Sequence, residues 1–180
     1  QRAFSIARKH QDQSLEMQAL VASACVDFHH GHNEQSLERN LRVIELSHLV
    51  DMPYKETHAH YDLFHVLYAM GDSDQAASHA ETMVASAERT RIRMWRSRAM
   101  EANEALGSAK GDWQTAREFT EQGLAISPQE STLMGARALV GYQLGETEAG
   151  DAYLNILFEN FQAGAFDSGF QANHTVPTVV

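Results

Sequence analysis

The chain is poor in several residue types, and each shortage excludes a class of protein. A single cysteine, Cys25, excludes an internal disulfide and a cysteine-based metal centre, and it fits a reducing compartment such as the cytoplasm. The three prolines, Pro53, Pro128 and Pro177, leave long windows open to helix. Alternating runs of Val, Ile and Thr are missing, so strands are not expected. We therefore expect an all-α protein.

Other absences concern function. No apolar run approaches the roughly 18 residues that a membrane helix needs, and we expect no signal peptide. No GxxxxGK[ST] pattern occurs, so the chain has no P-loop. The net charge of −10 repels a phosphate backbone. No ordered Ser, His and Asp set or carboxylate pair stands out. We therefore expect this chain to have no enzymatic activity and no cofactor, and to contact neither a membrane nor a nucleic acid.

The chain does contain a repeat. Four glycines, each followed by a helix-like segment, are spaced by 40, 40 and 34 residues: Gly31, Gly71, Gly111 and Gly145. A small residue stands five positions after each glycine: Ser36, Ala76, Ala116 and Gly150. An apolar residue stands thirteen positions after each: Ile44, Val84, Leu124 and Phe158. A fixed period of this length indicates a helical repeat array, in which small residues let helices approach closely.

Each glycine has a local reason to recur. It follows an amphipathic segment, and glycine is the preferred residue for the left-handed cap that ends a helix. Asp72 and Asp112, or Asn33 and Thr147 in the other two units, can then cap the next helix. Each unit therefore reads as helix, short turn, helix. Because neither helix buries its apolar stripe alone, neighbouring units must stack.

This pattern predicts about nine helices. We interpret residues 1–12 as the last helix of a truncated upstream repeat, with its helix over 2–11, and the chain as a piece of a larger protein. Residues 163–180 read as a loop-like tail. Four repeats follow residue 12, over approximately 13–50, 51–89, 90–128 and 129–162. Their helices are expected over 14–30, 33–49, 53–70, 73–88, 91–110, 113–126, 129–143 and 146–161.

The stretch GDWQTAREFTEQGLAISP, residues 111–128, resembles the second half of a tetratricopeptide repeat. Six residues match the family pattern: Gly111, Asp112, Trp113, Ala116, Leu124 and Pro128. Gly123 stands where the family usually has a second alanine. In the other units, Gly71, Asp72 and Ala76 match best. The resemblance covers roughly residues 14–161 and implies a right-handed α-solenoid that acts as a protein-interaction scaffold.

The 40-residue spacing and the final GFQANHTVPTVV also resemble the repeat region of large bacterial signalling proteins. These proteins join a LuxR-type DNA-binding domain or an adenylate/guanylate cyclase domain to a STAND-type ATPase and a helical repeat sensor. The resemblance implies a sensor or regulatory arm in signal transduction. Any ATPase or cyclase activity would then belong to other domains.

His58, Tyr61, His65 and Tyr68 follow one another at spacings of three and four, so they share one helix face. The family resemblance places this face on the concave side of the array. It also implies the other partner-binding residues there: Gln18, Cys25, Phe28, Arg98, Glu101 and Tyr142. A face that mixes aromatic rings, histidine and a few polar groups suits a peptide or an amphipathic helix.

Three alternatives stay open from the sequence. His58, Asp62 and His65 stand at i, i+4 and i+7, which is a candidate metal-binding face, although no established Cys/His spacing accompanies it. The same face could bind a small ligand instead. The array could also be a passive spacer. The exposed ends of a truncated array would favour a homodimer.

Overall fold

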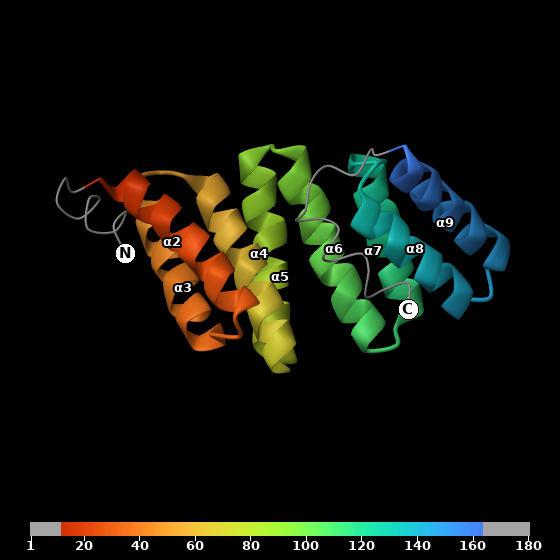
Figure 1. Cartoon of the computed structure of the whole chain (residues 1–180), viewed down its shortest axis with the longest axis horizontal. Coiled ribbons are helices and arrows are strands. Elements are labelled where there is room, and N and C mark those ends of the chain that lie inside the picture. Colours follow the sequence, from red (N-terminus) through yellow and green to blue (C-terminus); the bar gives the residue numbers. More distant parts are fainter. Residues whose placement is uncertain (1–11, 164–180) are drawn as a thin grey trace. The chain divides into compact units, whose positions relative to one another are not determined.

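The computed structural model describes residues 12–163, which form eight helices and no strand. The all-α expectation is confirmed for this part of the chain. The expected leading helix over 2–11 and the tail from residue 164 lie outside it. The helices are α2 (Gln13–His29), α3 (Asn33–Leu49), α4 (Pro53–Met70), α5 (Ser73–Thr90), α6 (Arg93–Ala109), α7 (Trp113–Ile126), α8 (Ser131–Gln143) and α9 (Thr147–Gln162) (Figure 1). Every bound agrees with the expected one to within two residues.

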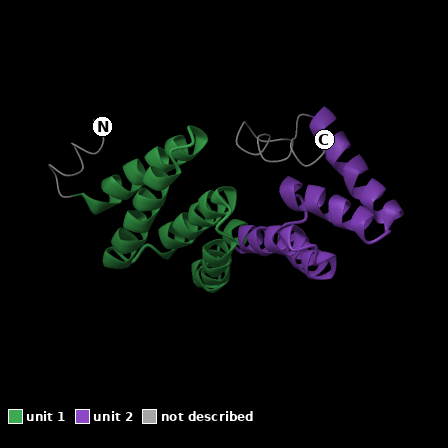
Figure 2. Cartoon of the chain, turned by 90° about the horizontal axis from the view of Figure 1, so that it is seen from below, with its two compact units in different colours: residues 1–95 green, residues 96–180 purple. Residues whose placement is uncertain are grey.

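The helices pack in chain order within two compact units, residues 1–95 and 96–180 (Figure 2). In the first unit α2 packs on α3, α3 on α4 and α4 on α5, and α2 also touches α4. In the second unit α7 packs on α8 and α8 on α9. Sequential packing of this kind is consistent with a helical repeat array.

The repeated glycines have the conformation that their position requires. All four have positive φ, and Gly71, at φ 81°, ends α4 in the left-handed conformation. A residue with a Cβ is disfavoured there. Asp72 and Asp112 cap the following helices as expected, since each carboxylate accepts a backbone N–H three residues on, at 3.1 Å.

The expected caps at Asn33 and Thr147 are wrong. Each is the first residue inside its helix, and the N-cap positions are taken by His32 and Glu146, which make no side-chain capping bond. The Glu146 carboxylate instead accepts hydrogen bonds from Arg117, at 2.6 Å, and Arg137, at 2.8 Å. The carboxylate is therefore held by the neighbouring helices rather than by its own helix terminus.

Small residues allow close helix contacts, as the repeat predicts. Ser36, Ala76, Ala116 and Gly150 are all buried. A Cβ atom on Gly107 of α6 would lie only 3.1 Å from the Ala116 backbone nitrogen of α7. In the first hairpin the Ser36 hydroxyl donates to the Ala24 carbonyl across the helix pair, at 3.0 Å. Trp113, half-buried at the start of α7, and Pro128, in the turn after it, bracket the third unit's second helix.

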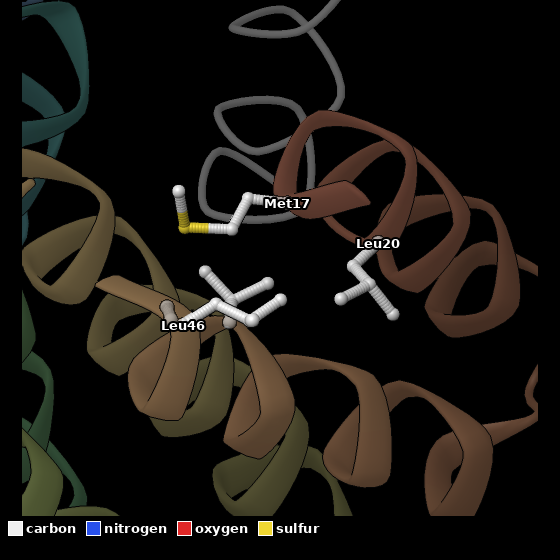
Figure 3. Packing of buried hydrophobic residues seen from close by; sticks show 5 residues of the cluster. Met17, Leu20 and Leu46 are labelled. Atoms are coloured by element: carbon white, nitrogen blue, oxygen red, sulfur yellow. The ribbon is translucent and has the colours of Figure 1, made fainter. Parts of the chain in front are cut away.

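Apolar residues on facing helices form the cores. In the first unit Met17, Leu20, Val43, Leu46 and Ala59 make one buried cluster, in which Met17, Leu20 and Leu46 converge between α2 and α3 (Figure 3). Each fully buried side chain of this size stabilises the fold by roughly 1.5–3 kcal/mol. The stacking of successive helices therefore supplies the burial that no single helix has.

The second unit has a cluster of Leu124, Leu133 and Met134. Leu124 is buried there because α8 covers it, but the equivalent residue of the last hairpin, Phe158, is 61% exposed. The repeat position that Leu124 occupies in the core is therefore exposed at Phe158. Leu157, one position earlier, packs on the cluster instead. No helix follows α9 in the described part of the chain.

We expect Asn40→Ala to stabilise the protein. The Asn40 side chain is fully buried, and neither its oxygen nor its nitrogen has a hydrogen-bond partner among the described residues. An unsatisfied buried amide costs about 1–3 kcal/mol, and the equivalent residue of the next hairpin is already alanine, Ala80. Chemical denaturation should show a gain of about 1 kcal/mol. Thr120→Ala is the control, since its hydroxyl bonds the Ala116 carbonyl and its loss should give no gain.

We expect Gly123→Ala to destabilise the protein. A Cβ at Gly123 would lie 2.5 Å from the Leu133 Cδ1 and 3.1 Å from the Met100 Cβ. Overpacking of this kind costs about 1–3 kcal/mol. This cost exceeds the ~1 kcal/mol of helix stability gained when alanine replaces glycine. Gly135→Ala is the matched control because its Cβ meets only the Leu157 Cδ1, at an ordinary 3.9 Å. A gain in stability for both variants in denaturant melts would contradict close packing at Gly123.

Candidate functional site

The most site-like surface lies on neighbouring first helices of two hairpins, α2 and α4. We call it the α2/α4 face, and it comprises Gln18, Cys25, Phe28, His58, Asp62, His65 and Tyr68. The side of α4 that buries Ala59, Leu63 and Val66 packs into the core. The periodicity of the helix therefore turns His58, His65 and Tyr68 the other way.

Packed rings hold the α4 part of this face. The Tyr61 and His65 rings meet edge-on with centroids 4.3 Å apart, and the Phe64 and Tyr68 rings lie 5.6 Å apart. His58 lies 4.8 Å from Trp95, in the first turn of α6. Tyr68 remains 39% exposed, and His58 and His65 are half-buried. The face therefore presents partly exposed aromatic side chains that neighbouring rings hold in place.

Tyr61 was expected to be a partner-binding residue, but it is buried. Only 5% of it is exposed, and Trp95 packs edge-on against it with a centroid distance of 6.1 Å. Tyr61 therefore supports His65 and Trp95 from beneath. Helical spacing could place Tyr61 on this side of α4, but it could not show that Trp95 lies against the ring.

His58 and Asp62 form a close pair, with the imidazole Nε2 3.7 Å from the carboxylate Oδ2. Burial, helped by the charge of Lys55, lowers the pKa of His58 to about 4. Burial raises the pKa of Asp62 to about 7, against the opposing effect of Lys55. Between about pH 4 and about pH 7 the proton of the pair therefore resides on the carboxyl group, and neither side chain is charged.

The three candidate metal ligands do not assemble into a site. His65 packs on Tyr61 and Phe64, while His58 pairs with Asp62. Across residues 12–163, no group of three or more His, Cys, Asp or Glu side chains has an arrangement that could hold a metal ion. Helical spacing puts His58, Asp62 and His65 on one side of α4, but it does not bring their side chains together around one metal position.

On α2, Cys25 is half-buried and its Sγ lies 3.8 Å from the His29 Nδ1. The same Nδ1 lies 2.8 Å from the Cys25 carbonyl oxygen. Burial, and then the negative charge of Asp62, raises the pKa of the Cys25 thiol, so it is not an activated nucleophile. Gln18 is exposed, and Phe28 lies half-buried with its ring edge-on to His29.

The second unit places its expected binding residues differently. Arg98 and Glu101 are 8% and 6% exposed, and the guanidinium donates to the carboxylate at 2.6 Å. A second Arg98 nitrogen lies 3.4 Å from Glu130. This pair therefore belongs to the interior rather than to a contact surface. Tyr142 is 38% exposed, and its hydroxyl donates to Asp151 at 2.5 Å.

Sequence reasoning missed a buried histidine pair on the core side of α4. The Nδ1 atoms of His60 and His79 lie 2.8 Å apart, so one ring must donate a proton to the other. Burial and the neighbouring His79 lower the pKa of His60 to about 4, and burial lowers that of His79. The signal was available, because the two residues stand at comparable distances on either side of the turn at Gly71.

Glu56 and its partners border the histidine pair. The Glu56 carboxylate accepts a bond from Arg89 at 2.5 Å and lies 3.4 Å from the His48 Nε2. Burial acts to raise the pKa of Glu56, but these two partners lower it more, so the carboxylate stays charged. Three successive helices, α3, α4 and α5, are thereby joined by one polar cluster.

No helix within residues 12–163 is long and apolar enough to cross a membrane.

Comparison with known proteins gives no relative: no family model matches the chain, and no curated protein matches it.

We expect acidification to destabilise the protein through His60 and His79. Their folded-state pKa values lie below the ordinary value of 6.5, so the unfolded chain binds protons first as pH falls. Stability should drop between about pH 6.5 and about pH 4, by up to about 3 kcal/mol for His60. Denaturant melts of His60→Asn/His79→Asn across this range should show a flatter profile than the wild type.

The comparison between wild type and variant isolates this contribution. His58 and Asp62 together hold one proton in both the folded and the unfolded chain in this range, so they nearly cancel. Glu104, whose pKa burial raises to about 7, acts in the opposite direction in both proteins. Parallel pH profiles for wild type and variant would contradict a neutral buried histidine pair.

Proposed function

We propose that the chain is a protein-interaction module in which the α2/α4 face binds a peptide or an amphipathic helix of a partner protein. The observation that carries the proposal is the gathering of Cys25, Phe28, His58, His65 and Tyr68 on two adjoining helices. They are partly exposed and come from positions that recur with the repeat. Binding surfaces are commonly built from aromatic side chains of this kind, with a large apolar body and a polar tip.

Two features of the face favour peptide binding. The rings of His58, His65 and Tyr68 are already packed against Trp95, Tyr61 and Phe64. Little side-chain entropy is then lost on binding. The His58–Asp62 pair is uncharged between about pH 4 and about pH 7, so the middle of the face carries no strong field in that range. A partner segment with apolar and uncharged polar side chains fits it better than a highly charged one.

We further propose that the fold is a right-handed α-solenoid of tetratricopeptide-like hairpins. Sequential helix packing and the tetratricopeptide-like residues around Gly111 support this fold. In such an array each hairpin contacts its neighbours, so that binding at one hairpin can bias the next. Together with the resemblance of the 40-residue period, this supports a role as the sensor or regulatory arm of a larger bacterial signalling protein. That last step is an analogy between families.

The test is selection of binding peptides from a random display library on the purified chain, followed by affinity measurements. For the selected peptides we expect His58→Ala/His65→Ala/Tyr68→Ala to weaken binding at least about tenfold, equivalent to about 1.4 kcal/mol. Tyr61 is left unchanged because it is buried. Met70→Ala is the matched control, since Met70 is 46% exposed on the opposite side of the same helix.

Circular dichroism would establish that all variants are equally helical. If the library yields no binder, or if binders tolerate the triple variant as well as Met70→Ala, the α2/α4 face is not a recognition surface. A passive spacer would then be the better interpretation.

A further inference from the structure

One position of the second helices is fully buried in the first three hairpins and only half-buried in the last. Nine residues after the turn glycine stand Asn40, Ala80 and Thr120, all with 0% exposure. The equivalent residue of α9 is Leu154, which is only half-buried although it is apolar. The repeat position that is fully enclosed in three helices is therefore only partly covered in the fourth.

Two further positions are more exposed in α9 than in the preceding hairpins. Thirteen residues after the glycine, Leu124 is 9% exposed and Ile44 and Val84 are half-buried, whereas Phe158 is 61% exposed. Sixteen residues after it, Ser47 and Ala87 are 2% and 1% exposed and Ser127 is half-buried, whereas Phe161 is 70% exposed. Leu154, Phe158 and Phe161 follow one another at spacings of four and three, so they form one stripe along the helix. We call this the α9 stripe.

The preceding hairpins show what covers this position when it is buried. Leu124 of α7 is buried by Leu133 and Met134 of α8, the next helix in the chain. In the first unit α4 packs on α3 in the same way. The α9 stripe thus occupies the place where an array receives a further helix, and it carries larger apolar side chains than the inner hairpins do. An amphipathic helix with a complementary apolar side fits this place.

Charge decides which helix fits. The sequence of α9, TEAGDAYLNILFENFQ, contains Glu148, Asp151 and Glu159 and no Lys or Arg. A second copy of α9 would bring the same three negative charges against them. Residues 164–180 contain Asp167 and no Lys or Arg, so this segment does not complement the charge either. A helix whose apolar stripe is flanked by Lys and Arg does.

We propose that the α9 stripe docks a basic amphipathic helix of a partner protein. The apolar side of that helix covers Leu154 and Phe158, and its flanking Lys and Arg side chains face Glu148, Asp151 and Glu159. This surface lies in the second unit and shares no residue with the α2/α4 face, so the two proposals succeed or fail separately.

The test uses a synthetic amphipathic helix of about 18 residues, with a leucine stripe flanked by Lys and Arg and a fluorescent label. Its twin has the same stripe flanked by Glu. We expect fluorescence anisotropy with the full 180-residue chain to show binding of the basic peptide alone, weakening as salt rises. Leu154→Ser/Phe158→Ser should weaken this binding at least about tenfold.

Leu41→Ser/Leu49→Ser is the matched control, because both leucines are exposed on α3 and lie outside the stripe. It should bind the basic peptide like the wild type, and so should Tyr68→Ala. Equal binding of the two peptides, or binding that survives Leu154→Ser/Phe158→Ser, overturns the proposal.

Two other results also overturn it by identifying a different occupant. Light scattering could show a dimer of the wild type that Leu154→Ser/Phe158→Ser abolishes, which would assign the stripe to a second copy. Binding of the basic peptide only after removal of residues 164–180 would assign it to that segment.

Discussion

Close approach of two helices at one small residue per hairpin is the constraint on which the rest of the structure depends. At Ser36, Ala76, Ala116 and Gly150 a larger side chain would hold the paired helices apart. Their close contact brings the apolar residues one or two turns further along into the same layer as those of the next helix. The core clusters and the orientation of each first helix follow from this contact.

The α2/α4 face is a consequence of that packing. Since one side of α4 is committed to the core, its histidines divide into two groups with different surroundings. His60 lies in the core layer and shares a proton with His79, while His58 and His65 lie on the opposite side among aromatic rings. Burial keeps His58 and His60 neutral in both places. A histidine-rich helix thereby becomes an aromatic surface rather than a cationic one.

Much of the fold could be predicted from the sequence because local rules determine it. Turn glycines, the aspartate caps at Asp72 and Asp112, and the apolar period are readable within one hairpin, and the helix bounds follow from them. Exposure could not be predicted, because it depends on what the next hairpin brings. Trp95 covers Tyr61, and α8 covers Leu124, whereas Phe158 has no such neighbour in the described chain. Arg98 and Glu101 are buried for the same kind of non-local reason.

The paired helices are also neighbours in sequence, and this has a consequence for how the chain folds. Each hairpin closes a short loop around its glycine turn, so the entropy lost before the first contacts form is small. Folding can begin at any hairpin and extend to the adjoining one, and chains dominated by such local contacts fold quickly. A defect in one hairpin would then open that hairpin first, while the others keep their structure.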